Sequence, residues 1–496
     1  MAEPVILLDR DATEGVVRQL VAALRLGILD GRLRAGDAVP STRALAAELD
    51  VSRSSVVAAY EQLAGEGYLE LRQGAATRVT AVQPRSTAEP AADAPTTTGA
   101  APDRARPAGP RTGHERTVPI VADLSPGVPS TARLDERAWR AAWRAAAVRP
   151  PTTSPPPLGV PELRRAIAEH LRSARGVACA PDDVVVTAGT GEALALVASA
   201  LVSLRGDDAR VGVEDPGYPA GRRALARHGA LPVPIPLDAD GLDLGALGRA
   251  LRPRRGRGLD AVMVTPSHQY PLGGRLPVAG RLALLAAAAR ADAVVIEDDY
   301  DSEFRHTGAP LPALASLDGG GERVVLVGSF SKVLTPWLRL GYIVLPGHEG
   351  LRTAVATARA ELDTPVAGPV QLAIADYLDR GALRRHIAAT RREYAHRRRM
   401  VQDALGSLDP GRARLCAVDG GLHAVLEVAD RDAERVLVAR LAADGVVVAP
   451  LAQYAASPPG AGGDRPGPAG IVLGYAGVGD LALAAALERI RAAVEG

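Results

Sequence analysis

The chain of 496 residues contains two cysteines, few aromatic side chains and almost no lysine. The two thiols, Cys179 and Cys416, form neither a disulfide framework nor a metal-binding pattern. A net charge of +1 produces no overall field that would attract nucleic acid or a membrane. The longest apolar run, residues 193–204, is about half a membrane span, and no charged-then-apolar leader follows Met1. We therefore expect a cytoplasmic protein without a membrane segment or a metal site.

Lys332 is the only lysine in the sequence. Arginine replaces lysine well in ion pairs and packing, but it keeps its proton and so does not attack a carbonyl group. A desolvated lysine amine does attack a carbonyl group and forms a Schiff base. The alternative is a surface lysine that persisted by chance, but the context favours chemistry. Gly328-Ser-Phe-Ser-Lys332 follows the apolar run 323–327, and Arg339 comes seven residues later.

Length and composition predict more than one globular domain. Hydrophobic residues make up 47% of the chain and charged residues 23%, which is ample for a large core. Residues 82–118 are rich in Pro, Ala, Thr and Gly without a period, so they cannot bury a core and are interpreted as a linker. We expect an N-terminal domain over residues 1–81 and a second domain over residues 119–496.

The N-terminal segment has the pattern of a winged helix-turn-helix. Apolar residues at helical spacing predict a helix over 16–29, and Ser/Thr caps precede two further helices over 43–49 and 53–66. Two short strands, 67–72 and 77–80, follow as a hairpin. The wording "LRAGDAVPSTRALAAELDVSRSSVVAAYEQLAGEGYLELRQGAATRV" resembles the DNA-binding domain of the GntR superfamily.

DNA contacts follow from that architecture. The N-terminus of the second helix of the motif enters the major groove. The candidate DNA-binding residues are Ser52, Arg53 and Ser54 on that helix, Arg43 with Ser41 and Thr42 before it, and Gly74 at the wing tip. The alternative is a small helical interaction module, and a slight excess of acidic residues over arginine in the segment favours it. A single copy should bind weakly, so we expect a homodimer on a double-stranded operator.

The C-terminal segment alternates strand-length apolar runs with Ala/Leu-rich helical stretches. This pattern is typical of a mostly parallel α/β sheet, in which ligands bind beyond the carboxyl ends of the strands. The expected strands are 184–186, 210–213, 261–264, 293–296, 324–327 and 342–345.

Polar and glycine-rich motifs follow several of these strands. Thr187-Ala-Gly-Thr-Gly-Glu192 opens a helix whose free N–H groups suit a phosphate. Tyr218 stands where it could stack on a planar ring, although a packed core tyrosine is the default interpretation. Five carboxylates crowd into Glu297-Asp-Asp-Tyr-Asp-Ser-Glu303. A metal could hold them together, but no histidine spacing supports one.

Taken together, "DPGYP", "TPSHQYPLG", "EDDYDSEFR", "GSFSKVLTPWLRLGY" and "GGLH" resemble the MocR/GabR group of regulators over nearly the full length. The resemblance implies an α/β fold in which a GntR-type head joins a fold-type I aminotransferase-like domain that binds pyridoxal 5′-phosphate. It implies that Lys332 forms the internal aldimine, that Asp298 pairs with the pyridine nitrogen, and that Tyr300 donates to the phenolic oxygen. The remaining implied cofactor ligands are Ser329, Arg339 and Gly189-Thr190-Gly191 for the phosphate, Tyr218 for stacking, and Tyr270 where aminotransferases keep an asparagine.

One position departs from the aminotransferase pattern. The strand Gly470-Ile-Val-Leu-Gly-Tyr475 has Val472 where amino-acid-binding relatives have a carboxylate-binding arginine. Without that bidentate partner a second ligand loses a few kcal/mol of binding. Hence we expect a regulator that responds to pyridoxal phosphate itself, as in the PdxR branch of the group. We expect it to work as a head-to-tail dimer in which each head lies over the partner's large domain, as in GabR-like proteins. The alternatives are a GabR-like sensor of an amine such as γ-aminobutyrate, with Arg222 or Arg223 as the anchor, and an aminotransferase with a DNA-binding appendage.

Overall fold

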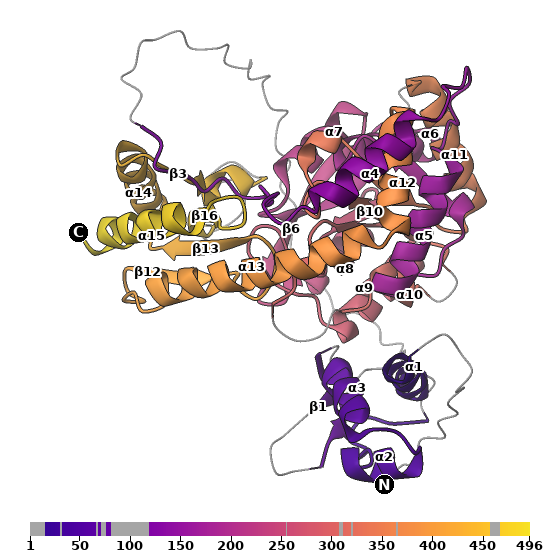
Figure 1. The fold of residues 1–496 in the computed structure, drawn as a ribbon, viewed down its shortest axis with the longest axis horizontal. Helices are drawn as coiled ribbons and strands as arrows, with labels where there is room; N and C mark the ends of the chain where they lie inside the picture. The colour runs from indigo at the N-terminus through magenta and orange to yellow at the C-terminus, as the bar shows by residue number, and fades with distance from the viewer. Residues whose placement is uncertain are drawn as a thin grey trace.

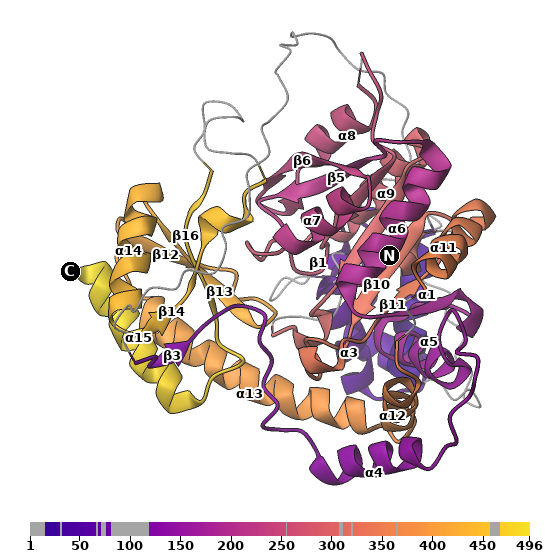
Figure 2. The same ribbon diagram turned by 90° about the horizontal axis from the view of Figure 1, so that it is seen from above.

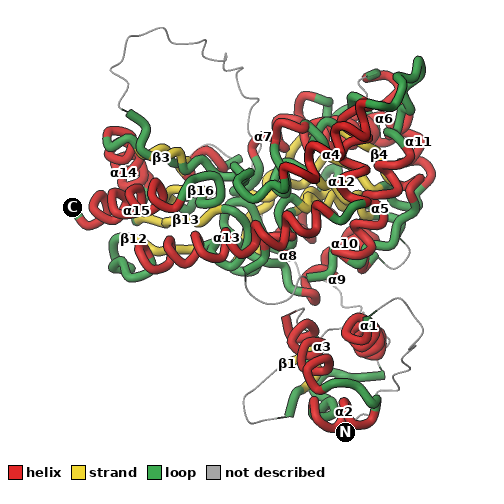
Figure 3. The backbone as a smooth tube through the Cα atoms, viewed as in Figure 1, coloured by secondary structure: helices red, strands yellow, loops and turns green. Residues whose placement is uncertain are grey.

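A computed structural model gives the fold of the chain. It describes residues 15–29, 32–65, 68–70, 76–80, 119–253, 255–306, 311–318, 321–363, 366–456 and 467–496. A small N-terminal head lies below a large α/β domain, and a smaller C-terminal domain lies beside that domain (Figures 1 and 3). Within the described ranges no helix combines the length and the apolar character that crossing a bilayer requires.

The head contains three helices and a two-stranded hairpin, as the sequence predicts. They are α1 (Val16–Leu29), α2 (Thr42–Glu48), α3 (Arg53–Gly65), β1 (Leu69–Glu70) and β2 (Arg78–Val79). The turn between α2 and α3 uses Asp50 at φ 51°, a left-handed conformation that aspartate tolerates. The Tyr60 hydroxyl donates to Pro40 O at 2.8 Å and ties α3 to the loop before α2.

The large domain is built on a sheet whose eight described strands follow the order β4-β11-β10-β9-β8-β5-β6-β7. All pairs are parallel except those of β11 with its two neighbours and of β7 with β6. The strands are β4 (Val184–Thr187), β5 (Arg210–Asp215), β6 (Leu231–Asp238), β7 (Gly241–Leu242), β8 (Ala261–Val264), β9 (Val294–Asp299), β10 (Val324–Ser329) and β11 (Gly341–Val344). The expected mostly parallel sheet is confirmed, whereas β6 and β7 were not predicted.

Helices cover both faces of this sheet. Alternate strand residues point to opposite faces, so Val185 packs in one core cluster while Val184 and Val186 pack in another. The first cluster includes α6 (Thr190–Arg205) and α11 (Glu349–Leu362), with α7 (Pro219–Arg227) against α6. The helices of the other face are α4 (Glu136–Ala147), α5 (Pro161–Arg175), α8 (Leu244–Leu251), α9 (Val278–Ala291), α10 (Leu314–Leu317) and α12 (Gly368–Asp379).

The small domain carries a sheet of four described strands in the order β12-β13-β16-β15. The long helix α13 (Ala382–Leu405) runs from the large domain into it (Figure 2). Its elements are β12 (Ala413–Cys416), β13 (His423–Val428), α14 (Arg431–Ala443), β15 (Ala449–Pro450), β16 (Ala469–Gly474) and α15 (Asp480–Glu495), with β14 (Val446–Val447) paired to β3 (Ala122–Asp123).

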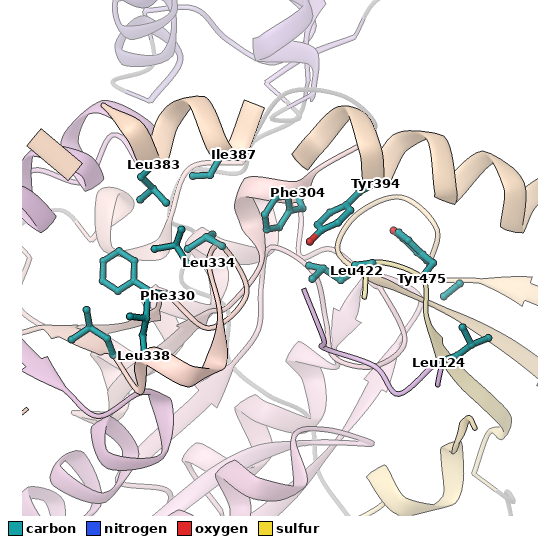
Figure 4. Packing of buried hydrophobic residues seen from close by; sticks show 14 of the residues in the cluster. Leu124, Phe304, Phe330, Leu334, Leu338, Leu383, Ile387, Tyr394, Leu422 and Tyr475 are labelled. Atoms are coloured by element: carbon teal, nitrogen blue, oxygen red, sulfur yellow. The ribbon is translucent and has the colours of Figure 1, made fainter. Parts of the chain in front are cut away.

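Both phenylalanines of the chain anchor loops that follow strands of the large sheet. Phe330 follows β10 and packs in one buried cluster with Leu334 and Leu338 (Figure 4). Phe304 ends the short 3-10 helix Ser302–Phe304 after β9, and its ring centroid lies 4.9 Å from that of Tyr394 on α13. These contacts fix the two loops that carry the predicted cofactor residues.

Phe304→Ala should lower the free energy of unfolding of the large domain by about 3–5 kcal/mol, because it leaves a cavity under a buried loop. Chemical denaturation followed by far-UV circular dichroism measures the change. Leu481→Ala is the matched control, since this side chain is 91% exposed. Equal losses in both variants would contradict the assignment of Phe304 to the core.

Candidate functional site

Strand register brings the predicted cofactor residues to one edge of the sheet. Val327 of β10 pairs with Asp298 of β9, so Asp298 and the Lys332 loop leave the sheet side by side. Ser329 pairs with Gly341 of β11, and Gly341 pairs with Thr187 at the end of β4. The segment Gly189–Gly191 therefore starts α6 next to Ser329. This is the carboxyl edge at which open α/β sheets bind ligands.

The side chain of Lys332 is half-buried, and its amine lies against the chain that leads into the large domain. Its Nζ donates to Gly127 O at 2.5 Å. Gly127 has a φ of +82°, which favours glycine, and a Cβ atom there would lie 2.6 Å from that Nζ, so a larger residue would displace the amine from this position. Burial lowers the pKa of the Lys332 amine, although Asp301 and Asp298 act in the opposite direction. A lowered pKa provides more of the neutral amine that attacks an aldehyde.

Asp298 is the buried carboxylate that best fits a ligand cation. It is 5% exposed, and no described residue hydrogen-bonds to its Oδ1. Burial raises the pKa of Asp298 to about 7, and the carboxylates of Asp299, Glu214 and Asp301 add to this rise. A buried acceptor without a partner is costly, and a protonated pyridine nitrogen would satisfy it. The residues present therefore fit pyridoxal phosphate at this end of the site.

The groups predicted to bind the phosphate, called here the phosphate cradle, lie around the N-terminus of α6. Arg339 is exposed and adopts φ 45°, a conformation uncommon for a non-glycine residue. Its Nη2 donates to Ala188 O at 3.2 Å, directly before Gly189. Gly189 has a φ of +85° and caps the helix that Thr190 and Gly191 begin. A guanidinium, a helix N-terminus and the nearby Ser329 form a set of donors that suits a phosphate.

Four tyrosines gather on the other side of this edge. The Tyr270 ring centroid lies 6.3 Å from that of Tyr218, 5.6 Å from that of Tyr300 and 5.2 Å from that of Tyr454. The Tyr270 and Tyr454 hydroxyl oxygens lie 3.1 Å apart. Burial raises the pKa of Tyr218, and Asp298 raises it further while Arg223 and Arg339 lower it, so Tyr218 lies within electrostatic range of two of the predicted cofactor residues. The aromatic rings of a chain that is poor in them are thus concentrated here.

Tyr300 and His268 belong to a buried polar network. The Tyr300 hydroxyl donates to His268 O at 2.9 Å, and His268 Nδ1 lies 2.9 Å from Asp301 Oδ2. His268, Asp301 and His423 have possible ligand atoms within 4.8 Å of one another. Burial and the neighbouring His268 lower the pKa of His423 to about 4, so its imidazole is neutral, and its Nε2 donates to Pro271 O at 2.9 Å. The role of Tyr300 as a donor to the phenolic oxygen stays a prediction.

Val472 is buried in an apolar cluster on the small-domain side. It is 0% exposed and packs with Val425, Leu451 and Tyr454. The segment after Tyr454 is fixed to the large domain, because Arg222 donates to Tyr454 O and Ala455 O, both at 2.9 Å. Arg222 is therefore already occupied by backbone carbonyls. Arg223, the other candidate anchor, is exposed on α7 and has no hydrogen-bond partner within the described ranges.

The candidate DNA-binding residues lie at the starts of α2 and α3. Ser41 Oγ accepts from Ala44 N at 3.1 Å, and Ser52 Oγ accepts from Ser55 N at 3.1 Å, so each serine caps a helix. Arg43, Arg53 and Ser54 are exposed, and Thr42 is half-buried as the first residue of α2. Gly74 lies outside the described residues. Exposed donors at the N-terminus of α3 suit contacts with base edges and phosphates.

Sequence reasoning missed the residues that arrive at this site from distant segments. They are Gly127, Asp301, His268, His423 and Tyr454. Asp301 and His268 stand inside motifs that the sequence analysis singled out, so the crowding of carboxylates after β9 was a usable signal. Nothing local marked Gly127 or Tyr454.

Comparison with known proteins agrees with this arrangement. Residues 119–462 match the family model "Aminotransferase class I and II", and residues 16–79 match "Bacterial regulatory proteins, gntR family". The "HTH-type pyridoxine biosynthesis transcriptional regulator PdxR" of Corynebacterium glutamicum is 41% identical over 96% of this chain and 95% of its own. The "Probable rhizopine catabolism regulatory protein MocR" of Rhizobium meliloti is 35% identical over 98% of this chain and 95% of its own.

Solved structures give the same fold for the C-terminal part. An alpha-aminoadipate aminotransferase of Thermus thermophilus superimposes with a TM-score of 0.65 at 26% identity, covering 76% of this chain and 92% of that one. An archaeal alanine:glyoxylate aminotransferase superimposes with a TM-score of 0.68 at 24% identity, covering 76% and 91%. The chain belongs to the MocR/GabR-type group of transcriptional regulators, in which a GntR-family helix-turn-helix head is joined to an aminotransferase class I and II domain.

Proposed function

We propose that this regulator responds to pyridoxal 5′-phosphate alone and controls genes for its synthesis. The observation that carries the proposal is Val472, which occupies the place of the carboxylate-binding arginine and is buried among apolar side chains. A guanidinium buried there would lose its hydration, at a cost of several kcal/mol for an unpaired charge. The regulator named for pyridoxine biosynthesis is similar over nearly the whole chain, which supports the same conclusion.

The residues at the sheet edge take separate roles in binding the cofactor. Pyridoxal phosphate supplies an aldehyde that condenses with a primary amine. Lys332 supplies that amine, Asp298 holds a proton at the ring nitrogen, and Tyr218 stacks on the ring. Arg339, Ser329 and the start of α6 bind the phosphate. Binding of pyridoxal phosphate favours one arrangement of the head relative to the large domain. The difference in cofactor binding free energy between the two arrangements then appears as a change in DNA affinity.

A second candidate function is a sensor of an amine such as γ-aminobutyrate. Arg223 favours it, because this exposed guanidinium lies near Tyr218 and has no described hydrogen-bond partner. Arg223 could bind a carboxylate that Val472 cannot. Transamination would need that carboxylate to be held in one orientation, and an exposed arginine on a helix surface provides this poorly.

The test follows the absorbance of protein-bound pyridoxal phosphate and the affinity for a duplex that the wild-type protein selects from a random library. The vitamer should produce the visible absorbance band and change DNA affinity by about 5- to 150-fold. Lys332→Ala should lose both effects, and Lys332→Arg, which keeps the charge, should lose them too. γ-Aminobutyrate and amino acids should leave the band unchanged. A shift with one amine would establish the second candidate instead.

Asp298→Asn should stabilise the cofactor-free protein at high pH. The folded chain raises the pKa of Asp298 from 3.8 to about 7, so the folded state binds the proton more tightly than the unfolded state. This contribution is complete below pH 4 and is lost as the pH rises through about 7. The difference corresponds to roughly 4 kcal/mol.

Urea denaturation at about pH 8 should therefore show a higher free energy of unfolding for Asp298→Asn than for the wild type, and at about pH 4 little difference. Asp432→Asn is the control, because the Asp432 side chain is 86% exposed. Asp298→Asn should also bind pyridoxal phosphate more weakly than the wild type. If the free energies of unfolding of Asp298→Asn and wild type differed by the same amount at both pH values, the raised pKa of Asp298 would be contradicted.

We also propose a head-to-tail homodimer in which a second copy covers Trp337. This residue is 93% exposed on the turn Pro336–Leu338, between Lys332 and Arg339. Large exposed aromatic side chains beside a functional site are typical of interfaces. The partner would thus lie next to the phosphate cradle.

Trp337→Glu should shift the protein from dimer toward monomer and weaken DNA binding, because two half-sites are no longer held together. Sedimentation velocity measures the first effect and DNA titration the second. Leu481→Glu replaces an equally exposed apolar residue, 91% exposed on α15, and should remain dimeric. A Trp337→Glu protein that stays dimeric would place the interface elsewhere.

A further inference from the structure

The head packs on a defined surface of its own chain's large domain, whereas the sequence analysis expects each head to lie over the partner's large domain. Val278 and Leu282 on α9, together with Leu311, belong to the same apolar cluster as the core of the head. We call these three residues the docking surface, and Figure 1 shows the head directly below α9 and α10. Arg18 of α1 also donates to Ser173 O near the end of α5. The head therefore contacts α5, α9 and the segment at Leu311.

Arg281 connects the docking surface to the end of β8. It lies on α9 beside Leu282 and is 0% exposed. Its guanidinium donates to Pro312 O at 2.9 Å and to Pro266 O at 2.6 Å. Pro312 follows Leu311 of the docking surface, and Pro266 lies two residues before His268. One buried side chain thus links the surface that holds the head to the loop that holds His268.

Arg175 makes a parallel connection to the end of β9. It lies two residues beyond Ser173, and its side chain is 3% exposed. It donates to Asp299 Oδ2 at 2.8 Å and to Leu311 O at 3.3 Å. Asp299 follows Asp298, the predicted partner of the pyridine nitrogen. A shift of Leu311 or α5 therefore acts on the residue next to Asp298 through one guanidinium.

The two arginines also balance charge at this edge. The Arg281 guanidinium lies 4.0 Å from Glu297 Oε1, and both side chains are 0% exposed. Burial raises the pKa of Asp299, while Arg175 lowers it. Asp298 and Asp299 are adjacent, so the charge of Asp298 acts on Asp299, and Arg175 bonds to both Asp299 and Leu311 O. A cavity of about 20 Å³, enough for one water, is lined by Arg175, His268, Asp301 and Leu311.

We propose that Arg175 and Arg281 are positioning residues that couple the cofactor end of β8 and β9 to the docking surface of the head. This inference rests on the proposed function, since it explains how an event at Lys332 and Asp298 reaches DNA. Both ends of the coupling are physically connected through hydrogen bonds rather than only lying near one another. The alternative is that both arginines merely stabilise the large domain.

Arg175→Lys and Arg281→Lys keep the charge but lose the fork of donors that holds two partners at once. Both variants should still give the visible band with pyridoxal phosphate and should bind the selected duplex without it. The ratio of DNA affinities with and without the vitamer should fall from the wild-type value to about 1. Arg164→Lys is the matched control, because Arg164 on α5 donates to Pro181 O and Val184 O, away from the docking surface.

Linkage gives a readout that loss of stability alone would not move. The duplex should change the affinity for pyridoxal phosphate by the same factor by which pyridoxal phosphate changes the affinity for the duplex. Both factors should fall to about 1 in Arg175→Lys and in Arg281→Lys. Leu282→Ser, which alters the docking surface without touching either arginine, should have the same effect and covers the case of an arginine variant that does not fold.

The outcomes separate the two proposals. A wild-type protein whose DNA affinity does not respond to pyridoxal phosphate would overturn the proposed function. A wild-type protein that responds, alongside Arg175→Lys, Arg281→Lys and Leu282→Ser proteins that respond equally, would overturn the coupling alone.

Discussion

The buried carboxylates at the end of β9 are the constraint on which the rest of the site depends. Arg281 lies near Glu297, Arg175 bonds to Asp299, and His268 bonds to Asp301. Asp298 differs from the other three because it has no arginine or histidine partner among the described residues. Its Oδ1 accepts no described hydrogen bond, which is also true of Glu297 Oε1 and Asp299 Oδ1. Isolated buried charge is costly. Three of these four carboxylates thus have a cationic or imidazole neighbour, and the proposed ligand cation would supply one for the fourth.

Most of the fold could be predicted because its strands are short runs of β-branched residues between turns. β6, Leu231–Asp238, was missed because prolines occupy positions 232, 234 and 236, which argues against a strand. Alternate residues of a strand point their N–H groups to the same side, so all three missing donors face away from β5. β6 therefore still pairs in parallel with β5. Only the register of the folded sheet reveals that these prolines are compatible with pairing.

The site could be predicted where its residues stand in local motifs and not where they meet through folding. Lys332, Asp298 and Arg339 follow strands in recognisable order, so the sequence placed them together. Tyr454 comes from the small domain, and its hydroxyl meets that of Tyr270 across 184 residues of sequence. Neither Arg175 nor Arg281 stands in a recognisable sequence motif. From sequence alone, an arginine on a helix is normally assigned to the solvent-exposed face. Their burial is a property of the packed molecule.

An apolar cluster on one side of an aminotransferase-like site limits the reactions open to the lysine-bearing side. Val472 and Tyr454 pack together in an apolar cluster, where the resemblance to aminotransferases leads us to expect a substrate carboxylate. The sheet edge keeps the lysine, the carboxylate and the helix N-terminus that we propose bind the cofactor. In the proposed function such a site exchanges one ligand and does not orient a second one for chemistry. Binding free energy that an enzyme would use on a transition state is then available to shift an equilibrium between two arrangements of the chain. Burial lowers the pKa of the Lys332 amine and so favours the neutral form that attacks an aldehyde. The burial that suits this lysine to Schiff-base formation therefore also suits it to the proposed role as a sensor.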